Sequence, residues 1–385
     1  MKILLAHNDY GKYSGEESVV DQMTAMWAEH GHQVVQLRMS TADSRDSLVG
    51  KMHGFLAGLY SPKGVREMRR ILKEERPDVV NVHNLYPFIS PAALFECKKA
   101  GVPIVMTIHN FRLICPTGLF MRDGLPCEVC LERGNEWSCV RYNCECNRLK
   151  SIGYTLRNVY ARWTGAYRKN VAAFACITDF QRQKLIAAGY EAERVTVIPN
   201  GIDAPTSYDL TGGNYVAYIG RLSYEKGYDL LIEVARRNPS IPFRFAGAKR
   251  EQSDMEIPGN VEFMGYLQKE ELSDFICHSR FVVMPSRCYE GFPMAILEAA
   301  CYGKPTIGPA HGGFTEIIGR GEQAIGDLFE PNNFDDLEQK VVSLWNRPDE
   351  IARLGEKAFE KLKREYSSEV IYQKWDNLFQ KLIKE

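Results

Sequence analysis

Short apolar segments alternate with longer helical patterns along all 385 residues of this chain, and this alternation limits the fold more than any other feature. Six buried strands are predicted in the first half, at 3–6, 33–37, 79–82, 104–108, 174–178 and 195–198. Six more are predicted in the second half, at 215–219, 243–246, 261–263, 281–284, 305–307 and 324–329. Helical patterns such as 17–29 and 64–73 lie between the strands. Because this rhythm is typical of parallel sheets, we predict an α/β fold with two doubly wound domains.

A polar loop near the middle of the chain marks the expected domain boundary. The segments 199–203 and 206–214 are rich in turn residues and indicate a hinge. We therefore expect an N-terminal domain over 1–203 and a C-terminal domain over 204–366. The last segment, 367–385, is expected to form a helix that packs back on the N-terminal domain, because its large apolar face must be covered.

The composition is ordinary for a globular protein, with 45% hydrophobic and 25% charged residues. No apolar run approaches the roughly 20 residues that a membrane-spanning helix needs. The apolar start, 1–6, is too short for a signal peptide and fits a buried strand better. These features favour the cytoplasm, where the eleven cysteines are expected to be thiols or metal ligands and not disulfides.

Two glutamates eight positions apart, Glu290 and Glu298, flank the predicted start of a helix. Pro293 suits the first helical position and Gly303 suits the position after the last turn, so a helix of about ten residues is expected. Glu290 then lies in the preceding loop, where the backbone amides that follow it can face an anion or a polar group.

Glu298 is expected one to two turns into this helix, where its carboxylate can accept hydrogen bonds from a vicinal diol. The plain alternative is that Glu290 caps the helix and that Glu298 is a solvated residue. The apolar residues between 295 and 300 argue against solvation, because a partly buried carboxylate needs a partner.

A second motif, 220–227, follows a predicted strand directly and contains Arg221 and Lys226. Ligands of open α/β sheets bind beyond the carboxyl ends of the strands, so both cations project toward an expected ligand site. Two such cations can hold a diphosphate, Arg221 as a bidentate fork and Lys226 as a point charge. The alternative is a solvated surface turn that pairs with Glu225.

The loop after the first predicted strand, 7–17, contains glycines that would let the backbone approach a phosphate closely. It does not match Gly-x-Gly-x-x-Gly, and no acidic residue ends the second strand. A dinucleotide-dependent oxidoreductase is therefore disfavoured.

These motifs resemble the retaining glycosyltransferases of family 4, the group 1 glycosyltransferases with the GT-B fold. The residues that carry the resemblance are Pro199-Asn200-Gly201-Ile202-Asp203, Gly220-Arg221 with Lys226-Gly227, and Glu290-Gly291-Phe292-Pro293 to Glu298 with Gly303-Lys304-Pro305. The resemblance covers essentially the full length and is strongest over 198–329. It implies two Rossmann-like domains that face each other across a cleft.

The resemblance also implies how a nucleoside diphosphate sugar, the donor, is bound. Arg221 and Lys226 would hold the diphosphate, and Glu298 would hold the ribose hydroxyls. Glu290 would hold hydroxyls of the transferred sugar. The backbone amides that complete this set are those of Gly291 and Phe292.

The N-terminal domain would contribute two further residues. Gly15 would offer its amide to the diphosphate, although the paired glycines usual in the family appear here as Ser14-Gly15. His109, at the end of the strand 104–108, matches the family's histidine beside the donor sugar. Without the resemblance, a buried core histidine is the simpler interpretation of His109.

The expected mechanism follows from charge. Cleavage of the sugar–phosphate bond develops negative charge on the leaving diphosphate, which preorganised cations and amides stabilise. No Asp-x-Asp motif follows an apolar strand, so Arg221 and Lys226 would replace a catalytic metal, and none is expected. The resemblance implies retention by front-face attack of the acceptor hydroxyl, with a lipid-linked or polysaccharide acceptor.

Two other functions would fit a similar scaffold. A nucleotide-sugar epimerase would convert its nucleotide sugar with no acceptor present. A non-catalytic, zinc-stabilised protein would bind the nucleotide sugar without turnover. Against this loss of activity, the four expected side chains are all present: Glu290, Glu298, Arg221 and Lys226.

Five of the eleven cysteines fall within twenty residues, inside an expected Cys-rich loop over 111–147. They are Cys127, Cys130, Cys139, Cys144 and Cys146. Four of the five suit a closed structural zinc site, because one Cys-x-x-Cys pair and two later thiolates complete a tetrahedron. An iron–sulfur cluster and free thiols are the alternatives, since no fixed template spacing is matched.

The next segment, 148–170, carries six Lys and Arg residues and four aromatic residues but no acidic residue. A basic aromatic helix of this kind suits an anionic membrane, and residues 1–200 carry a net charge of +6 against −7 for the rest. We expect a cytoplasmic enzyme that can lie peripherally on the inner face of the cell membrane. A helix packed on its own domain is the alternative. No nucleic-acid-binding fold accompanies the segment, so nucleic acid is not an expected partner.

Overall fold

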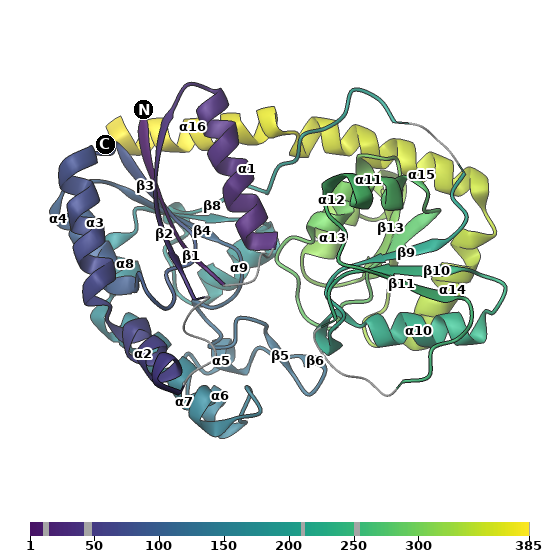
Figure 1. The fold of residues 1–385 in the computed structure, drawn as a ribbon, viewed down its shortest axis with the longest axis horizontal. Coiled ribbons are helices and arrows are strands. Elements are labelled where there is room, and N and C mark those ends of the chain that lie inside the picture. Colours follow the sequence, from purple (N-terminus) through teal and green to yellow (C-terminus); the bar gives the residue numbers. More distant parts are fainter. Residues whose placement is uncertain (11–14, 42–47, 209–211, 250–254, 385) are drawn as a thin grey trace. The chain divides into compact units, whose positions relative to one another are not determined.

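The computed structural model describes residues 1–10, 15–41, 48–208, 212–249 and 255–384, without the side chains of 48–53 (Figure 1). The chain divides into two compact units. Unit 1 comprises Met1–Leu119, Glu128–Asn200 and Ile371–Glu385, and unit 2 comprises Phe120–Cys127 and Gly201–Val370. Each unit contains a six-stranded, all-parallel sheet, which confirms the predicted α/β fold with two Rossmann-like domains.

The sheet of unit 1 has the spatial order β2-β1-β3-β4-β7-β8. Its strands are β1 (Lys2–Asp9), β2 (Gln33–Ser40), β3 (Val79–Val82), β4 (Ile104–Ile108), β7 (Ala173–Cys176) and β8 (Val195–Val197). The central strands β3 and β4 are buried along their whole length, as is typical of a parallel sheet covered on both faces. The direction in which the chain adds strands reverses between β1 and β3, so the topological switch point lies there.

The helices of unit 1 connect these strands and cover the sheet (Figure 1). They are α1 (Gly15–Glu29), α2 (Leu48–Leu59), α3 (Pro62–Glu75), α4 (Leu94–Lys99), α5 (Val129–Glu132), α6 (Ser138–Arg141), α7 (Arg148–Thr164), α8 (Ala166–Asn170) and α9 (Asp179–Ala187). The C-terminal helix α16 (Ser368–Lys384) also packs on this unit. Its buried Trp375 and Phe379 lie 6.0 and 5.5 Å, by ring centroids, from Trp27 of α1.

The sheet of unit 2 has the spatial order β11-β10-β9-β12-β13-β14. Its strands are β9 (Val216–Ile219), β10 (Phe243–Ala246), β11 (Val261–Gly265), β12 (Phe281–Val283), β13 (Thr306–Pro309) and β14 (Gly326–Phe329). The chain builds β9, β10 and β11 outward in one direction and then returns to place β12 on the other side of β9. The switch point of unit 2 therefore lies between β9 and β12.

The helices of unit 2 enclose a core rich in phenylalanine. They are α10 (Tyr228–Arg237), α11 (Lys269–Cys277), α12 (Met294–Ala300), α13 (Gly313–Ile318), α14 (Phe334–Trp345) and α15 (Pro348–Lys361). Phe243, Phe245 and Phe281 are at most 1% exposed and pack with Leu231 of α10 and Leu337 of α14. Burial of this continuous apolar cluster fixes the strand ends that position the site.

The sequence interpretation missed local structure in the Cys-rich loop. A two-stranded antiparallel hairpin of β5 (Met121–Arg122) and β6 (Leu125–Pro126) turns through Asp123-Gly124, both with positive φ. Asp-Gly is a strong hairpin-turn signal, so this element was readable from the sequence. The predicted continuous helix over 148–170 is wrong, because Gly165, with φ +72°, separates α7 from α8.

Candidate functional site

The switch point of unit 2 brings together two motifs that lie far apart in the sequence. Arg221 and Lys226 lie in the turn after β9, and Glu290 lies in the segment after β12. Lys226 and Glu290 are 64 positions apart, yet their side chains are in contact because β9 and β12 are neighbours. Open α/β sheets bind ligands at this place.

Lys226 and Glu290 form an ion pair. The ammonium of Lys226 and the hydroxyl of Ser286, the latter at 2.8 Å, both donate to Oε1 of Glu290. Burial opposes the charged form of each group, but the partner charge outweighs it. The pKa of Glu290 is therefore lowered and the pKa of Lys226 is raised, so both side chains are charged near neutral pH.

Both hydrogen bonds to the Glu290 carboxylate reach the same oxygen. Among the described residues, Oε2 has no hydrogen-bond partner, so this oxygen can accept a hydrogen bond from a ligand hydroxyl. The backbone carbonyl of Glu290 accepts from the amide of Gly313 at 2.8 Å, which fixes the loop that carries the side chain.

Arg287 and Asp229 hold the two segments together, and the sequence interpretation did not identify them. The guanidinium of Arg287 makes a bidentate pair with Asp229, with both N–O distances 2.6 Å, and also donates to the carbonyl of Tyr224 at 2.7 Å. The backbone amide of Arg287 donates to the carbonyl of Glu225 at 3.0 Å. These bonds fix the turn of Lys226 against the segment after β12. No local sequence pattern predicts the pairing of Arg287 with Asp229, because the two residues are 58 positions apart.

Gly227 allows this close approach of the two segments. Its φ is +69°, and a Cβ at this position would lie 1.9 Å from the carbonyl oxygen of Pro285. Only glycine fits such a contact, so Gly227 allows the turn to pack directly against the end of β12.

Arg221 is more exposed than Lys226, with 45% of its side chain accessible. Its guanidinium lies 3.3 Å from the carboxylate of Glu225, the pairing that the sequence suggested as the alternative to ligand binding. An ion pair of this exposure contributes little to stability, so the pairing does not prevent Arg221 from binding an anion.

Glu298 lies one turn into α12, as the sequence predicted. The helix spans seven residues instead of about ten, because Pro293 precedes it as the N-cap and Cys301 ends it. Among the described residues the Glu298 carboxylate has no ion-pair or hydrogen-bond partner, and burial raises its pKa to about 7. A half-buried carboxyl without a protein partner is a candidate for ligand contact.

Three histidines lie at the carboxyl ends of neighbouring strands at the switch point of unit 1. His7 belongs to β1, His83 follows β3 and His109 follows β4. Nδ1 of His83 and Nε2 of His109 are 2.6 Å apart, with ring planes within 18° of each other. Burial lowers the pKa of both rings, so this pair is neutral near pH 7. The sequence predicted a site role for His109 but not for its partner His83.

Gly15 is the first residue of α1. A Cβ at this position would have no atom of the described residues within 4 Å, so packing against them does not require glycine there. Ser14 and the rest of 11–14 lie outside the described residues, and with them most of the predicted phosphate-binding loop.

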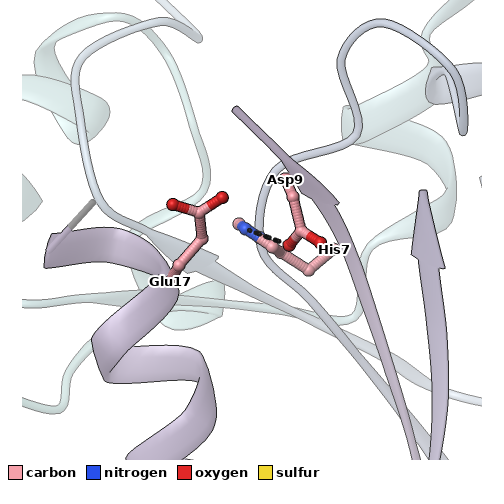
Figure 2. Close-up of side chains that lie close together, drawn as sticks. All are labelled: His7, Asp9 and Glu17. Carbon is pink, nitrogen blue, oxygen red and sulfur yellow. Dashed lines mark ion pairs between the residues drawn. The ribbon is translucent and has the colours of Figure 1, made fainter. Parts of the chain in front are cut away.

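One group of three side chains in the described part of the chain could hold a metal ion: His7, Asp9 and Glu17 (Figure 2). One ligand atom of each residue lies within 4.8 Å of the other two. His7 and Asp9 are two positions apart in β1, so their side chains lie on the same face of the sheet, and Glu17 lies in the first turn of α1. The sequence interpretation missed this group, whose local signal was His-x-Asp at the end of an apolar strand.

The clustered cysteines are spread over both units. Cys127 belongs to unit 2, and the other four belong to unit 1. A hydrogen bond between Cys139 and Cys144 lowers the pKa of Cys139, and Cys130 is close enough to oppose this shift. Among the described residues, no three of these thiols approach within 4.8 Å of one another, and the zinc site stays a prediction.

Most of the basic residues of α7 and α8 are exposed, but several make contacts within their own unit. Arg157 lies over the ring of Tyr86 at 4.2 Å, Arg162 pairs with Glu136 at 2.9 Å, and Arg168 donates to a backbone carbonyl. Exposed apolar side chains accompany them at Leu149, Ile152 and Trp163. In the parts of the chain that the structure covers, no helix has the length and apolar character needed to span a membrane.

Comparison with known proteins agrees with this geometry. Residues 13–205 match Glycosyltransferase Family 4, and residues 207–361 match Glycosyl transferases group 1. A Klebsiella pneumoniae protein described as an uncharacterized 42.6 kDa protein in cps region is 28% identical over 312 residues, which is 77% of this chain and 76% of that protein.

Two solved structures share the fold. Anabaena HepE, in complex with UDP and glucose, aligns over 99% of this chain and 100% of its own, with a TM-score of 0.68 and 16% identity. A lipopolysaccharide outer core galactosyltransferase aligns over the same shares, with a TM-score of 0.65 and 18% identity. At these identities the likeness shows the fold alone. The two family matches show what the chain is: a glycosyltransferase of group 1 and family 4, with the GT-B fold.

Proposed function

We propose that this glycosyltransferase moves a sugar, with retention of configuration, from a nucleoside diphosphate sugar to a hydroxyl of a lipid-linked or polysaccharide acceptor. We also propose that the transfer step uses no metal ion. The observation that carries the proposal is the charged Lys226–Glu290 pair beside the exposed Arg221 at the switch point of unit 2. This arrangement offers two cations to a diphosphate and one unpaired carboxylate oxygen to a sugar hydroxyl.

The proposed reaction needs no external acid or base, because the departing diphosphate takes up the proton that the acceptor loses. The bond between the anomeric carbon and the diphosphate oxygen breaks, and the acceptor oxygen forms a new bond to that carbon. The acceptor proton passes to the departing diphosphate. Arg221 and Lys226 stabilise the negative charge that develops there, and loss of one such contact costs about 10²–10³ in rate. Retention rests on the family resemblance.

The remaining predicted residues have proposed donor roles. Glu298 would accept hydrogen bonds from the ribose hydroxyls, and its lack of a partner among the described residues supports this role. His109 would lie beside the transferred sugar, and its neutral ring supports hydrogen bonding over charge pairing. The backbone amides proposed to complete the donor site are those of Gly15, Gly291 and Phe292.

The solved structures support particular classes of donor and acceptor for this proposal. The complex of HepE with UDP and glucose supports a uridine diphosphate sugar as the first donor to test. The galactosyltransferase, named for the lipopolysaccharide outer core, supports a glycan on a lipid as the acceptor class.

The proposal is tested by incubating the full chain with a panel of nucleoside diphosphate sugars. The true donor should raise the melting temperature and be hydrolysed slowly without acceptor, and Glu290→Gln should abolish the hydrolysis. The initial rate should not change when Mg²⁺ is omitted. No stabilisation by any donor would contradict the donor site. Conversion of the donor to an epimer would contradict glycosyl transfer, although no observation favours that alternative.

We further propose that four of Cys127, Cys130, Cys139, Cys144 and Cys146 hold a structural zinc ion. The contact of Cys139 with Cys144, and the position of Cys130 close by, support it. Zinc content of the purified chain should be one ion per chain and should fall in Cys139→Ser but not in Cys277→Ser, a cysteine of α11 in unit 2. Equal zinc content in both variants would contradict the site, and iron in place of zinc would indicate an iron–sulfur cluster.

A peripheral position on the inner, cytoplasmic face of the cell membrane is also proposed. The exposed side chains Leu149, Ile152 and Trp163 lie on α7 among lysine and arginine residues, a composition that suits an anionic lipid surface.

A further inference from the structure

We propose that His7, Asp9 and Glu17 bind one divalent transition-metal ion, of the class of Mn²⁺, Fe²⁺ or Zn²⁺, where β1 ends and α1 begins. The ion would have a structural role within unit 1. This inference does not depend on the donor or acceptor proposed above, because its residues are separate from those assigned to the donor.

The three side chains converge from two adjoining elements (Figure 2). Nε2 of His7 lies 3.5 Å from Oδ1 of Asp9, and one ligand atom of Glu17 lies within 4.8 Å of both. An ion about 2.1 Å from each ligand atom needs those atoms roughly 3–4 Å apart. The observed spacing therefore needs only a small inward rotation of side chains.

Two of the three residues each have a buried side-chain atom that lacks a hydrogen-bond partner among the described residues. These atoms are Nε2 of His7, in a residue that is 0% exposed, and Oε2 of Glu17, in a residue that is 3% exposed. A buried polar atom without a partner is costly and needs an explanation. An ion between the two atoms would satisfy both at once.

The other polar atoms of these residues are held in ways that suit metal ligands. Oε1 of Glu17 accepts from the backbone amide of Tyr10 at 2.9 Å, so Oε2 is the oxygen that has no hydrogen-bond partner among the described residues. Arg38 donates to Oδ1 of Asp9 through Nε and Nη2 at 3.1 and 2.9 Å. Ligating carboxylates commonly accept hydrogen bonds from such outer partners, which orient them.

The second ring nitrogen of His7 can carry the proton that coordination through Nε2 requires. Nδ1 accepts a long hydrogen bond from the backbone amide of Asn84 at 3.4 Å and lies 3.9 Å from Oε1 of Glu16. Coordination through Nε2 would move the ring proton to Nδ1, where a bond to the Glu16 carboxylate would replace the long bond from Asn84. Imidazole paired with a carboxylate in this way is common in metal sites.

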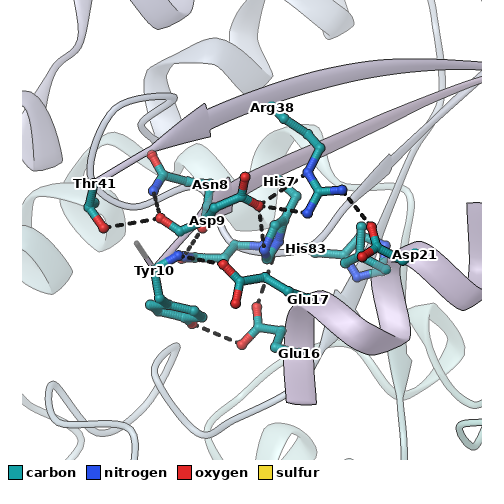
Figure 3. A network of polar contacts seen from close by, with 12 residues as sticks. His7, Asn8, Asp9, Tyr10, Glu16, Glu17, Asp21, Arg38, Thr41 and His83 are labelled. Carbon is teal, nitrogen blue, oxygen red and sulfur yellow. Dashed lines mark hydrogen bonds and ion pairs between the residues drawn. The ribbon is translucent and has the colours of Figure 1, made fainter. Parts of the chain in front are cut away.

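The charges around the group also favour a cation (Figure 3). Four carboxylates lie in this network, from Asp9, Glu16, Glu17 and Asp21, and Arg38 is the cation that pairs directly with two of them. A second cation, Arg112, reaches the network through the hydroxyl of Tyr10, which donates to Glu16. Among the described residues, two cations face four carboxylates, and one divalent ion would balance the difference in charge.

The ligand set selects the class of ion. One imidazole with two carboxylates suits Mn²⁺, Fe²⁺ or Zn²⁺, whereas Mg²⁺ and Ca²⁺ prefer oxygen alone. Mn²⁺ is the best probe for this chain because thiolates bind it poorly, so the Cys-rich loop does not contribute to the signal.

The test is to strip the full chain with EDTA, dialyse it against Mn²⁺, and measure bound manganese by elemental analysis and electron paramagnetic resonance. We expect one Mn²⁺ per wild-type chain and a rise in melting temperature on binding. Glu17→Gln, which keeps the shape of the side chain, and His7→Ala should each weaken binding at least tenfold. The matched control Glu29→Gln, at the exposed end of the same helix, should bind as wild type does.

Two outcomes would overturn the proposal. The first is the absence of saturable manganese binding by the wild-type chain. The second is equal binding by wild type and Glu17→Gln, which would place the ion elsewhere. Because Glu17→Gln could affect folding, its circular dichroism spectrum is compared with that of Glu29→Gln, and His7→Ala gives an independent result.

Discussion

The ammonium of Lys226 donates a hydrogen bond to the carboxylate of Glu290 across two neighbouring strand ends of unit 2. Each side chain is therefore held by the other and not only by the loop that carries it. Because the pair is mostly buried, removing one partner should affect stability as well as donor binding. Substitutions that keep shape but change charge can separate the two effects.

Glu290→Gln should leave the fold intact and lower the rate of glycosyl transfer by about 10²–10³. The amide oxygen of glutamine can still accept from Lys226, but it accepts a sugar hydroxyl more weakly than a carboxylate does. Initial rates at saturating donor, together with melting temperatures, provide the measurement. Glu225→Gln is the matched control, because Glu225 pairs with Arg221 and has no assigned donor contact. Wild-type rates in Glu290→Gln would remove Glu290 from the site.

Lys226→Met should destabilise the protein by about 3–5 kcal/mol, because it leaves the buried Glu290 carboxylate without its cation. The double variant Lys226→Met/Glu290→Gln should recover most of this loss, since no unpaired charge remains. Neither variant should transfer sugar at a significant rate. Chemical denaturation of the wild type, the two single variants and the double variant gives the coupling free energy between the two side chains. A coupling free energy near zero would show that the ion pair does not stabilise unit 2.

Glu298 should make stability depend on pH between about 4.5 and 7. Burial raises its pKa in the folded state to about 7, from an ordinary value of 4.5. Between these values the folded state keeps a proton that the unfolded state has lost, so stability falls as pH rises through this window. For a partly buried carboxyl the loss is on the order of 2 kcal/mol.

Glu298→Gln removes this titration. The variant should match wild type near pH 4 and be more stable above pH 7, while its affinity for the donor should be lower at the higher pH. Melting temperatures and donor titrations across pH 4–8 test both expectations. Parallel pH profiles of the variant and wild type would show that Glu298 is not the titrating group.

The strand pattern made most of the fold predictable. All twelve predicted strands exist, and β4 has the predicted bounds Ile104–Ile108 because every one of its residues is buried and apolar or small. The alternation of short apolar segments with helical patterns therefore predicted the strands of both parallel sheets. The break between α7 and α8 was harder to foresee, because glycine ends a helix only where the backbone reaches a positive φ, as Gly165 does.

The site was predictable only in part, for a physical reason. Motifs close in sequence, such as the turn with Arg221 and Lys226, carry their own signal. The pairing of Arg287 with Asp229 and the contact of His83 with His109 depend on which strands become neighbours. A single sequence does not encode strand order in any local pattern, so these partners appear only in the fold.

Arg287→Lys should reduce donor affinity without removing any group that contacts the donor. Lysine cannot form the bidentate pair with Asp229 and also reach the carbonyl of Tyr224, so the turn that carries Lys226 would lose its support. We expect about a tenfold rise in KM for the donor with a smaller change in kcat. Arg236→Lys, in an exposed pair on α10, is the control. Equal effects of both variants would show that Arg287 has no positioning role.

The exposed face of α7 should bind anionic membranes weakly. Trp163 and Leu149 are 80% and 82% exposed, an uncommon position for such large apolar side chains. Wild-type protein should therefore sediment with vesicles that contain anionic lipid and much less with neutral vesicles, and added salt should weaken binding. The double variant Trp163→Ala/Leu149→Ala should lose most of this binding, because it keeps the charges but removes the side chains that would enter the lipid interface. Leu56→Ala/Ile383→Ala, which alters two exposed apolar residues on other helices, is the matched control. If both double variants bind anionic vesicles as wild type does, the helix is simply packed on its own domain, and the acceptor must reach the enzyme without its help.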